Sequence, residues 1–208
     1  MSPSHTGAIL LKCTGLLSVP QEELQLNVKV IAVDCLPLSE SIAVHAALEG
    51  GETYAYLFSR EPGAVTHAVL ASVLRRARAL PAFERAEIHA VRLKPMFDLA
   101  GASRVEAPLF HYVVETDVDP EHEADMNAWY DTEHLPGLAA CPGSARARRF
   151  RNPDGSPRYH ACYDLVNSET LGSGPWLAVR NTAWSDRVRP HLRNPKRTLF
   201  RRLFESEL

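Results

Sequence analysis

In the second half of the chain, short runs of alternating apolar and polar residues are separated by longer helical patterns. Pro108–Asp117 (PLFHYVVETD) is rich in β-branched and aromatic residues, which predicts a strand. Asp119-Pro120 then offers a helix N-cap followed by a proline at the first helical position. We therefore expect a helix that runs to about Leu135, where Pro136-Gly137 is expected to stop it.

Two more strands follow, because Ser144–Arg151 and Arg158–Leu165 flank an Asn-Pro-Asp-Gly-Ser-Pro turn. A second helix is expected near Pro175–His191, and a last strand at Arg197–Phe204. The order β-α-β-β-α-β is that of a ferredoxin-like unit.

The first half repeats this pattern in a degraded form. Its tyrosine-rich strand at Thr53–Ser59 (TYAYLFS) resembles Arg158–Leu165 (RYHACYDL) in its alternation. The first helix is not apparent, because Pro20–Leu26 is short and the NVKVIAV that follows looks extended. The other expected elements are a strand, a helix and a strand at Gly7–Thr14, Ala64–Leu80 and Glu84–Leu93.

We therefore predict an α+β protein of two tandem ferredoxin-like domains, a degenerate one at residues 1–100 and a second at 107–208. Asp98–Glu106, poor in apolar residues, is the expected linker. Both helices of such a domain cover one face of its antiparallel sheet and leave the other bare. Two sheets packed face to face would cover each other as an α+β barrel, within one chain or between chains, and would enclose a cavity.

Composition narrows the possible partners. The 208 residues include 23 basic and 25 acidic side chains, which is far from the basic footprint that nucleic-acid binding needs. No stretch reaches the roughly 18 apolar residues of a membrane span, and the N-terminus does not resemble a signal peptide. The four cysteines show no C-x-x-C spacing, which favours a reducing compartment and a cytoplasmic location.

The expected helix before Pro136 carries an unusual inward face. On a helical wheel, five residues fall within an arc of roughly 140°: Met126, Trp129, Tyr130, Glu133 and His134. The stripe is apolar for two turns and then becomes polar. In one interpretation His134 caps the last turn, where the helix dipole favours a cation, and the aromatics are core. In the other, the histidine faces a pocket and carries chemistry.

The motif W-Y-D-T-E-H-L-P at residues 129–136, followed by C-P-G and R-A-R-R-F, resembles the dimeric α+β-barrel superfamily, and most closely its EthD-like family. The resemblance covers about Pro108–Phe204. It implies a pocket for a small organic ligand with the histidine at its mouth. Relatives include lactone isomerases, decarboxylases, cofactor-free monooxygenases and haem-binding enzymes, so the reaction is not fixed. The first half lacks the motif, so one site per chain is expected.

Other candidates lie on the strands. His111 and Glu115 share one face of Pro108–Asp117, opposite Tyr112, and this more polar face is expected to line the cavity. Arg148 is a candidate for binding a carboxylate, although arginines of this strand can also pair with surface acids. A metal site built from His111, Glu115 and His134 has no supporting ligand spacing, so no metal is expected.

The favoured hypothesis is an enzyme with His134 as general acid/base, assisted by Glu133 and by the hydroxyl of Tyr130 or Tyr112, on a small apolar compound of a catabolic pathway. Trp129 would form an apolar wall. Isomerisation, decarboxylation and oxygenation all remain open, without a cofactor, although haem is not excluded. Alternatives are a non-catalytic ligand-binding or interaction module and a haem-binding oxidoreductase.

Two further expectations accompany this hypothesis. Burial should lower the pKa of His134, whereas Glu133 or Glu115 should raise it, which would leave it near neutrality. A homodimer is expected because the strand edge at Arg197–Phe204 looks open to pairing.

Overall fold

A computed structural model describes residues 7–16, 19–61 and 63–208. The first six residues, on which part of the signal-peptide expectation depends, lie outside this range. The chain forms two compact units. The N-terminal unit comprises the described residues up to Pro95 together with Leu199–Leu208, and the C-terminal unit comprises Met96–Thr198.

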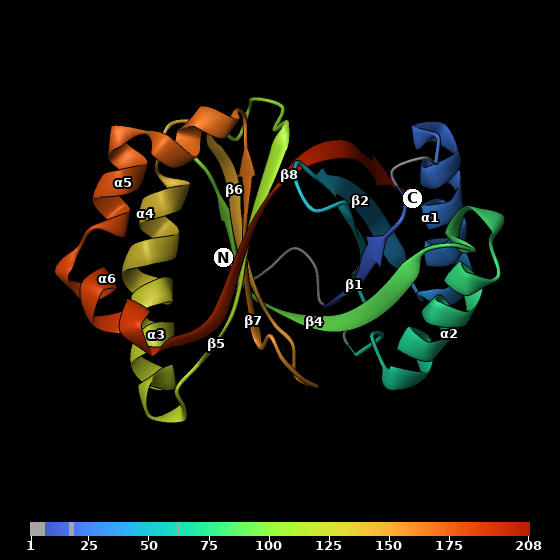
Figure 1. Cartoon of the computed structure of the whole chain (residues 1–208), viewed down its shortest axis with the longest axis horizontal. Coiled ribbons are helices and arrows are strands. Elements are labelled where there is room, and N and C mark those ends of the chain that lie inside the picture. Colours follow the sequence, from blue (N-terminus) through green and yellow to red (C-terminus); the bar gives the residue numbers. More distant parts are fainter. Residues whose placement is uncertain (1–6, 17–18, 62) are drawn as a thin grey trace. The chain divides into compact units, whose positions relative to one another are not determined.

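The N-terminal unit contains two helices and an antiparallel sheet. Its elements are β1 (Gly7–Thr14), α1 (Gln21–Cys35), β2 (Ser39–Ala47), β3 (Glu52–Ser59), α2 (His67–Arg78), a 3-10 turn (Pro81–Phe83) and the first part of β4 (Glu87–Ala100). Strand β1 pairs with β3 and β4, and β2 pairs with β3. Both helices lie on one face of this sheet (Figure 1).

Helix α1 corrects the sequence analysis, which found no clear first helix and took NVKVIAV as extended. It spans 15 residues, and its buried positions are Leu24, Val28, Ile31 and Ala32. This spacing of four, three and one residues is that of one helical face. The β-branched residues favour a strand locally, but the core contact of this face outweighs that preference.

The C-terminal unit has the expected element order. Its elements are β5 (Phe110–Val118), a 3-10 turn (Pro120–His122), α3 (Glu123–Trp129), a π-helical turn (Tyr130–His134), α4 (Leu135–Ala139), β6 (Ser144–Arg151), β7 (Tyr159–Leu165), a 3-10 turn (Ser168–Gly172), α5 (Gly174–Arg180), α6 (Ala183–Val188), a 3-10 turn (Arg189–His191) and the first part of β8 (Leu192–Glu207). Strand β7 pairs with both β5 and β6. The helices cover one face of the sheet (Figure 1).

The predicted second helix of this unit is two helices, α5 and α6. The break occurs because the Thr182 hydroxyl accepts a hydrogen bond from the backbone N–H of Ser185 and so starts a new helix.

The strands follow the hydrogen-bonded order β1-β3-β2-β8-β5-β7-β6-β4, which closes as an antiparallel barrel sheet. The predicted α+β class and ferredoxin-like barrel are confirmed. No helix of the described ranges is long and apolar enough to cross a membrane.

Two details of the predicted boundaries were wrong. Asp98 to Ala100 belong to β4, so the expected linker begins as strand. The residues after it are also fixed, because Gly101 and Ser103 donate backbone hydrogen bonds to the carbonyls of Ala145 and Ser144. The edge at Arg197–Phe204 is not open either, since β8 pairs with β2 from Phe200 to Glu207.

Candidate functional site

The helix that carries the W-Y-D-T-E-H-L-P motif does not end at Pro136-Gly137, contrary to expectation. A π-helical turn interrupts it at Tyr130–His134, where the backbone N–H of Leu135 donates to the carbonyl of Tyr130, five residues earlier. Pro136 then lies in the first turn of α4, where its missing N–H and fixed φ are tolerated. π-helical turns of this kind are frequent at functional sites.

Gly137 allows α4 to approach α5 closely. A Cβ atom at this position would lie 2.8 Å from Cγ1 of Val179. The Pro-Gly pair therefore supports continuation and close packing of the helix rather than its end.

A cavity lies between the sheet and the helices of the C-terminal unit. Its volume is about 30 Å³, or about 400 Å³ of empty space when its solvent-open mouth is counted. The wall combines aromatic, aliphatic and basic side chains: Tyr112, Val114, Trp129, Tyr130, His134, Leu138, Tyr163, Trp176, Arg180, Arg189, Leu192 and Arg197. A volume of about 30 Å³ accommodates little more than water, so a larger ligand requires movement of the side chains that line the cavity.

Stacked and edge-to-face rings form the inner wall. The imidazole of His134 stacks on the indole of Trp129, with ring centroids 4.0 Å apart and an interplanar angle of 23°. Tyr130 meets the same two rings edge-on. Across the cavity, Tyr163 packs edge-on against Trp176 at 5.3 Å. These contacts hold the rings in fixed orientations.

Three buried polar atoms of this wall have no hydrogen-bond partner in the part of the chain that the structure describes. They are Nε1 of Trp129, Nδ1 of His134 and the hydroxyl oxygen of Tyr163. Their side chains are only 2%, 7% and 1% exposed. Each unsatisfied buried group costs about 1–3 kcal/mol, so three such groups around one cavity make it a candidate ligand site.

Three arginines from different elements form the outer part of the wall. Arg180 ends α5, Arg189 begins a 3-10 turn and Arg197 lies in β8. The Arg189 guanidinium donates to the backbone carbonyl of Arg180. Burial and, next, the charge of Arg180 lower the pKa of Arg189, which Asp186 partly offsets. The outer wall therefore concentrates positive charge.

The charge state of His134 differs from the expectation. Burial, and next the positive charges of Arg189, Arg180 and Arg149, lower the pKa of His134 to about 3. The expected near-neutral value was wrong, because the acids thought to raise it lie elsewhere. The imidazole is neutral at ordinary pH. Burial likewise raises the pKa of Tyr130 and, more strongly, of Tyr163, so both are neutral phenols.

Glu133 is one of the predicted residues that the cavity wall does not include. Its carboxylate accepts a hydrogen bond of 2.6 Å from the hydroxyl of Thr182 and so ties the π-helical turn to the start of α6. The wheel placed Glu133 on the inward stripe, but the change from α- to π-helical geometry turns it aside.

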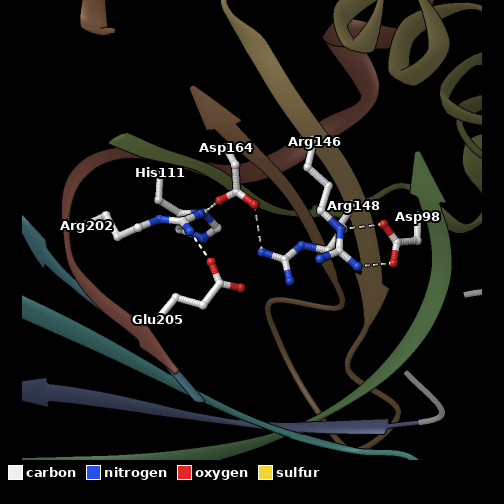
Figure 2. A network of polar contacts seen from close by, with 7 residues as sticks. All are labelled: Asp98, His111, Arg146, Arg148, Asp164, Arg202 and Glu205. Atoms are coloured by element: carbon white, nitrogen blue, oxygen red, sulfur yellow. Dashed lines mark hydrogen bonds and ion pairs between the residues drawn. The ribbon is translucent and has the colours of Figure 1, made fainter. Parts of the chain in front are cut away.

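His111, Glu115 and Arg148 lie on the opposite face of the sheet, away from this cavity. Asp164 accepts a hydrogen bond of 3.0 Å from Arg148 and contacts Nδ1 of His111 at 2.8 Å (Figure 2). Glu115 contacts His160 at 3.2 Å. All five are almost completely buried. Because side chains alternate across a strand, Tyr112 reaches the helix side, whereas His111 and Glu115 cannot.

The structure therefore brings together four predicted residues, Tyr112, Trp129, Tyr130 and His134, and separates the rest. The sequence analysis did not identify Tyr163, Trp176 or the three arginines as site residues. Tyr159, Ala161 and Tyr163 alternate along β7, so they share one face of the strand, and this pattern could have placed Tyr163 on the helix side. The arginines converge only through the fold, so no local spacing could have revealed them.

Neither a metal nor a haem is supported by this arrangement. Within the described ranges, no group of three or more histidine, cysteine or acidic side chains is positioned to hold a metal ion. The space now present in the cavity is too small for a haem unless the aromatic side chains of the wall move, and no step through haem is derived.

Comparison with known proteins identifies the fold. No protein-family model matches the sequence, and no curated protein matches it either. Among solved structures, a monooxygenase candidate from Lactobacillus acidophilus superposes with a TM-score of 0.66 at 12% identity, covering 97% of this chain and 96% of that one.

Two other solved structures agree. An anthrone oxidase-like protein gives a TM-score of 0.59 at 15% identity, over 97% of this chain and 93% of the other. A chlorite dismutase variant from Candidatus Nitrospira defluvii gives 0.60 at 8% identity, over 95% and 92%. The chain thus has the dimeric α+β barrel (ferredoxin-like) fold, with which the EthD-like resemblance is consistent.

Proposed function

We propose that the C-terminal unit is a cofactor-free enzyme that removes or relocates a proton on a small apolar organic compound bound in the cavity. The observation that carries this proposal is the set of three unpartnered polar atoms on Trp129, His134 and Tyr163 around one aromatic pocket. An apolar site with a few convergent polar groups is the usual form of a small-molecule site.

The proposed chemistry starts from a ligand whose ring packs against Trp129 and Trp176. The Tyr163 hydroxyl and the Trp129 N–H donate hydrogen bonds to an oxygen of the ligand. His134 accepts a proton at Nδ1 from an acidic C–H beside that oxygen, and the electrons of the broken bond move to the oxygen as an enolate. The arginines of the outer wall stabilise the resulting negative charge. Return of the proton to another carbon completes an isomerisation.

The solved structures of this fold suggest a probe. One of them is an anthrone oxidase-like protein, and anthrone is a planar, apolar ketone with an acidic CH₂ group. Proton abstraction from anthrone is measurable as deuterium exchange in D₂O without oxygen, by proton NMR. This readout needs no oxidation step.

The test compares His134→Asn and Tyr163→Phe with the wild-type protein. We expect His134→Asn to slow protein-catalysed exchange by about 10²–10⁴-fold, as for loss of a proton-transfer group. His89→Asn, a change of an exposed histidine outside the C-terminal unit, is the matched control and should leave exchange unchanged. Equal exchange by His134→Asn and the wild type would refute the role of His134.

A second candidate is a ligand-binding or interaction module without turnover. It is supported by the low pKa of His134, which makes the imidazole a weak base in the free protein. If anthrone binds and quenches tryptophan fluorescence but exchanges no faster than in buffer, this alternative is favoured.

We also retain four broader proposals. Residues 1–100 and 107–208 are related domains, with one ligand site per chain. The protein is cytoplasmic and a homodimer. The exposed Leu26 and Val33, two turns apart on α1, support a contact between copies. Sedimentation of a monomer at high concentration would contradict the homodimer.

A further inference from the structure

The arginines of the cavity wall differ from most of the other arginines of the C-terminal unit. Six arginines of this unit are paired with a carboxylate: Arg146 with Asp98, Arg148 with Asp164, Arg149 with Asp131, Arg158 with Glu123, Arg187 with Asp125 and Arg193 with Asp119. By contrast, Arg180 and Arg197 have no side-chain hydrogen bond or ion pair within the described ranges, as is also true of Arg104 and Arg151 outside the cavity wall. What distinguishes Arg180 and Arg197 is that they lie beside a cavity whose lining includes no acid.

Most arginines of the unit are thus paired with a carboxylate, whereas Arg180 and Arg197 place positive charge beside a cavity. Arg189 adds to it, with its guanidinium held against the carbonyl of Arg180. Mutual repulsion among cations costs stability unless an anion compensates. A guanidinium is suited to binding a carboxylate through two parallel hydrogen bonds.

The inner wall limits what kind of anion fits. Next to the arginines lie the rings of Trp129, Tyr163 and Trp176, and the aliphatic side chains of Val114 and Leu138. A bare inorganic anion would leave this apolar surface uncovered. A ligand with a ring at one end and a carboxylate at the other satisfies both parts of the wall.

We propose that the cavity binds an aromatic or alicyclic carboxylate, with the ring against Trp129 and Trp176 and the carboxylate on Arg180 and Arg197. This inference rests on the proposed function, because it takes the same cavity as the ligand site and names its substrate class. The bound carboxylate also offsets the arginine charges that act on His134, and so makes the imidazole a better proton acceptor than in the free protein.

The test uses three acids and their neutral amides: benzoate, phenylacetate and 3-phenylpropionate against benzamide, phenylacetamide and 3-phenylpropanamide. Affinity is measured by calorimetry and by tryptophan fluorescence. We expect at least one acid to bind about tenfold or more tightly than its amide, as a charge-assisted bidentate contact provides. Added salt should weaken the acid more than the amide.

Charge-removing variants test where the anion binds. The double variant Arg180→Gln/Arg197→Gln should reduce the affinity for the acid to that for the amide and leave the amide unchanged. Arg104→Gln, in an exposed turn outside the cavity wall, is the matched control and should change neither. Thermal unfolding verifies that the double variant folds. If it does not fold, the two single variants are used instead, and each should show about half of the loss in affinity.

The possible outcomes distinguish a failure of this inference from a failure of the proposed function. Equal affinities for acid and amide would overturn the carboxylate preference but leave the cavity as a ligand site. A preference for the acid that survives the double variant would overturn the assignment to Arg180 and Arg197. Failure of all six compounds to bind below about 10 mM would count against both proposals.

Discussion

The imidazole of His134 stacks on the indole of Trp129, five residues earlier, at a centroid distance of 4.0 Å. In a regular α-helix, residues five apart point about 140° away from each other and cannot stack. The π-helical turn at Tyr130–His134 makes the contact possible, because its hydrogen bond joins residues five apart. The position of the histidine in the cavity wall is therefore a consequence of this local change in helix geometry.

The buried neutral histidine predicts an acid-sensitive contribution to stability. In the folded protein the pKa of His134 is about 3, below its ordinary value of 6.5. Between these values the unfolded chain binds a proton that the folded chain does not, so stability falls as pH decreases from about 6.5 towards 3. At pH 5 the loss from this one group is about 2 kcal/mol relative to pH 7.5.

His134→Asn removes this titrating group, so a comparison with the wild type separates its effect from that of the other histidines. We expect the difference in unfolding free energy between wild type and variant to shift by about 2 kcal/mol in favour of the variant between pH 7.5 and pH 5. Urea unfolding at both pH values measures it. A pH-independent difference would show that the imidazole is protonated, or accessible to protons, in the folded state.

Gly137 is predicted to be required for the packing of α4 on α5. A methyl group there would meet the stiff side chain of Val179 at 2.8 Å, so Gly137→Ala should destabilise the protein by about 1–2 kcal/mol despite the better helix propensity of alanine. In a Val179→Ala background the clash is absent, and the same change should stabilise by up to about 1 kcal/mol. Thermal unfolding of the four proteins measures this reversal of sign, and its absence would refute the packing role.

Gly101 gives a stronger steric prediction. Its Cβ position lies 2.1 Å from the backbone carbonyl oxygen of Ser144, which cannot move as a side chain can. Gly101→Ala should therefore cost about 3 kcal/mol or more, by overpacking. The neighbouring Ala102 is exposed, so Ala102→Ser should change stability by less than about 0.5 kcal/mol. Similar urea midpoints for the two variants would contradict the close approach.

The strands of the C-terminal unit were predictable because their alternation and the turns between them are local features. Helix α1 was not, since Val28 and Ile31 favour a strand until the sheet beneath them offers a core contact. The inward position of Trp129 and Tyr130 followed from helical periodicity, whereas the stacking of His134 on Trp129 depends on the π-helical turn.

The rest of the site depended on long-range geometry. His111 and Glu115 lie on the sheet face away from the helices, as strand alternation predicts, and there they contact Asp164 and His160 on the neighbouring strand. The cavity lies on the helix side of the sheet instead. Arg180 and Arg197 meet at the cavity only after α5 and β8 have packed. Sequence spacing carries no information on such convergence.

The last prediction concerns Asp164, whose carboxylate contacts both His111 and Arg148 on the sheet face opposite the cavity. It lies 2.8 Å from Nδ1 of His111 and 3.0 Å from a guanidinium nitrogen of Arg148 (Figure 2). The Arg148 side chain is only 3% exposed. Asp164→Asn removes the negative charge that contacts this buried guanidinium, so a loss of about 3–5 kcal/mol is expected.

Two further variants test the physical reason for this prediction. Asp34→Asn breaks an exposed aspartate–arginine pair, with Arg76 at 2.8 Å, and should cost at most about 1 kcal/mol. In the double variant Asp164→Asn/Arg148→Met, the buried charge is gone and the asparagine can still contact His111. The double variant should therefore unfold at a higher urea concentration than Asp164→Asn alone. If adding Arg148→Met lowers stability further, the cost of Asp164→Asn does not arise from the loss of the carboxylate beside the Arg148 guanidinium.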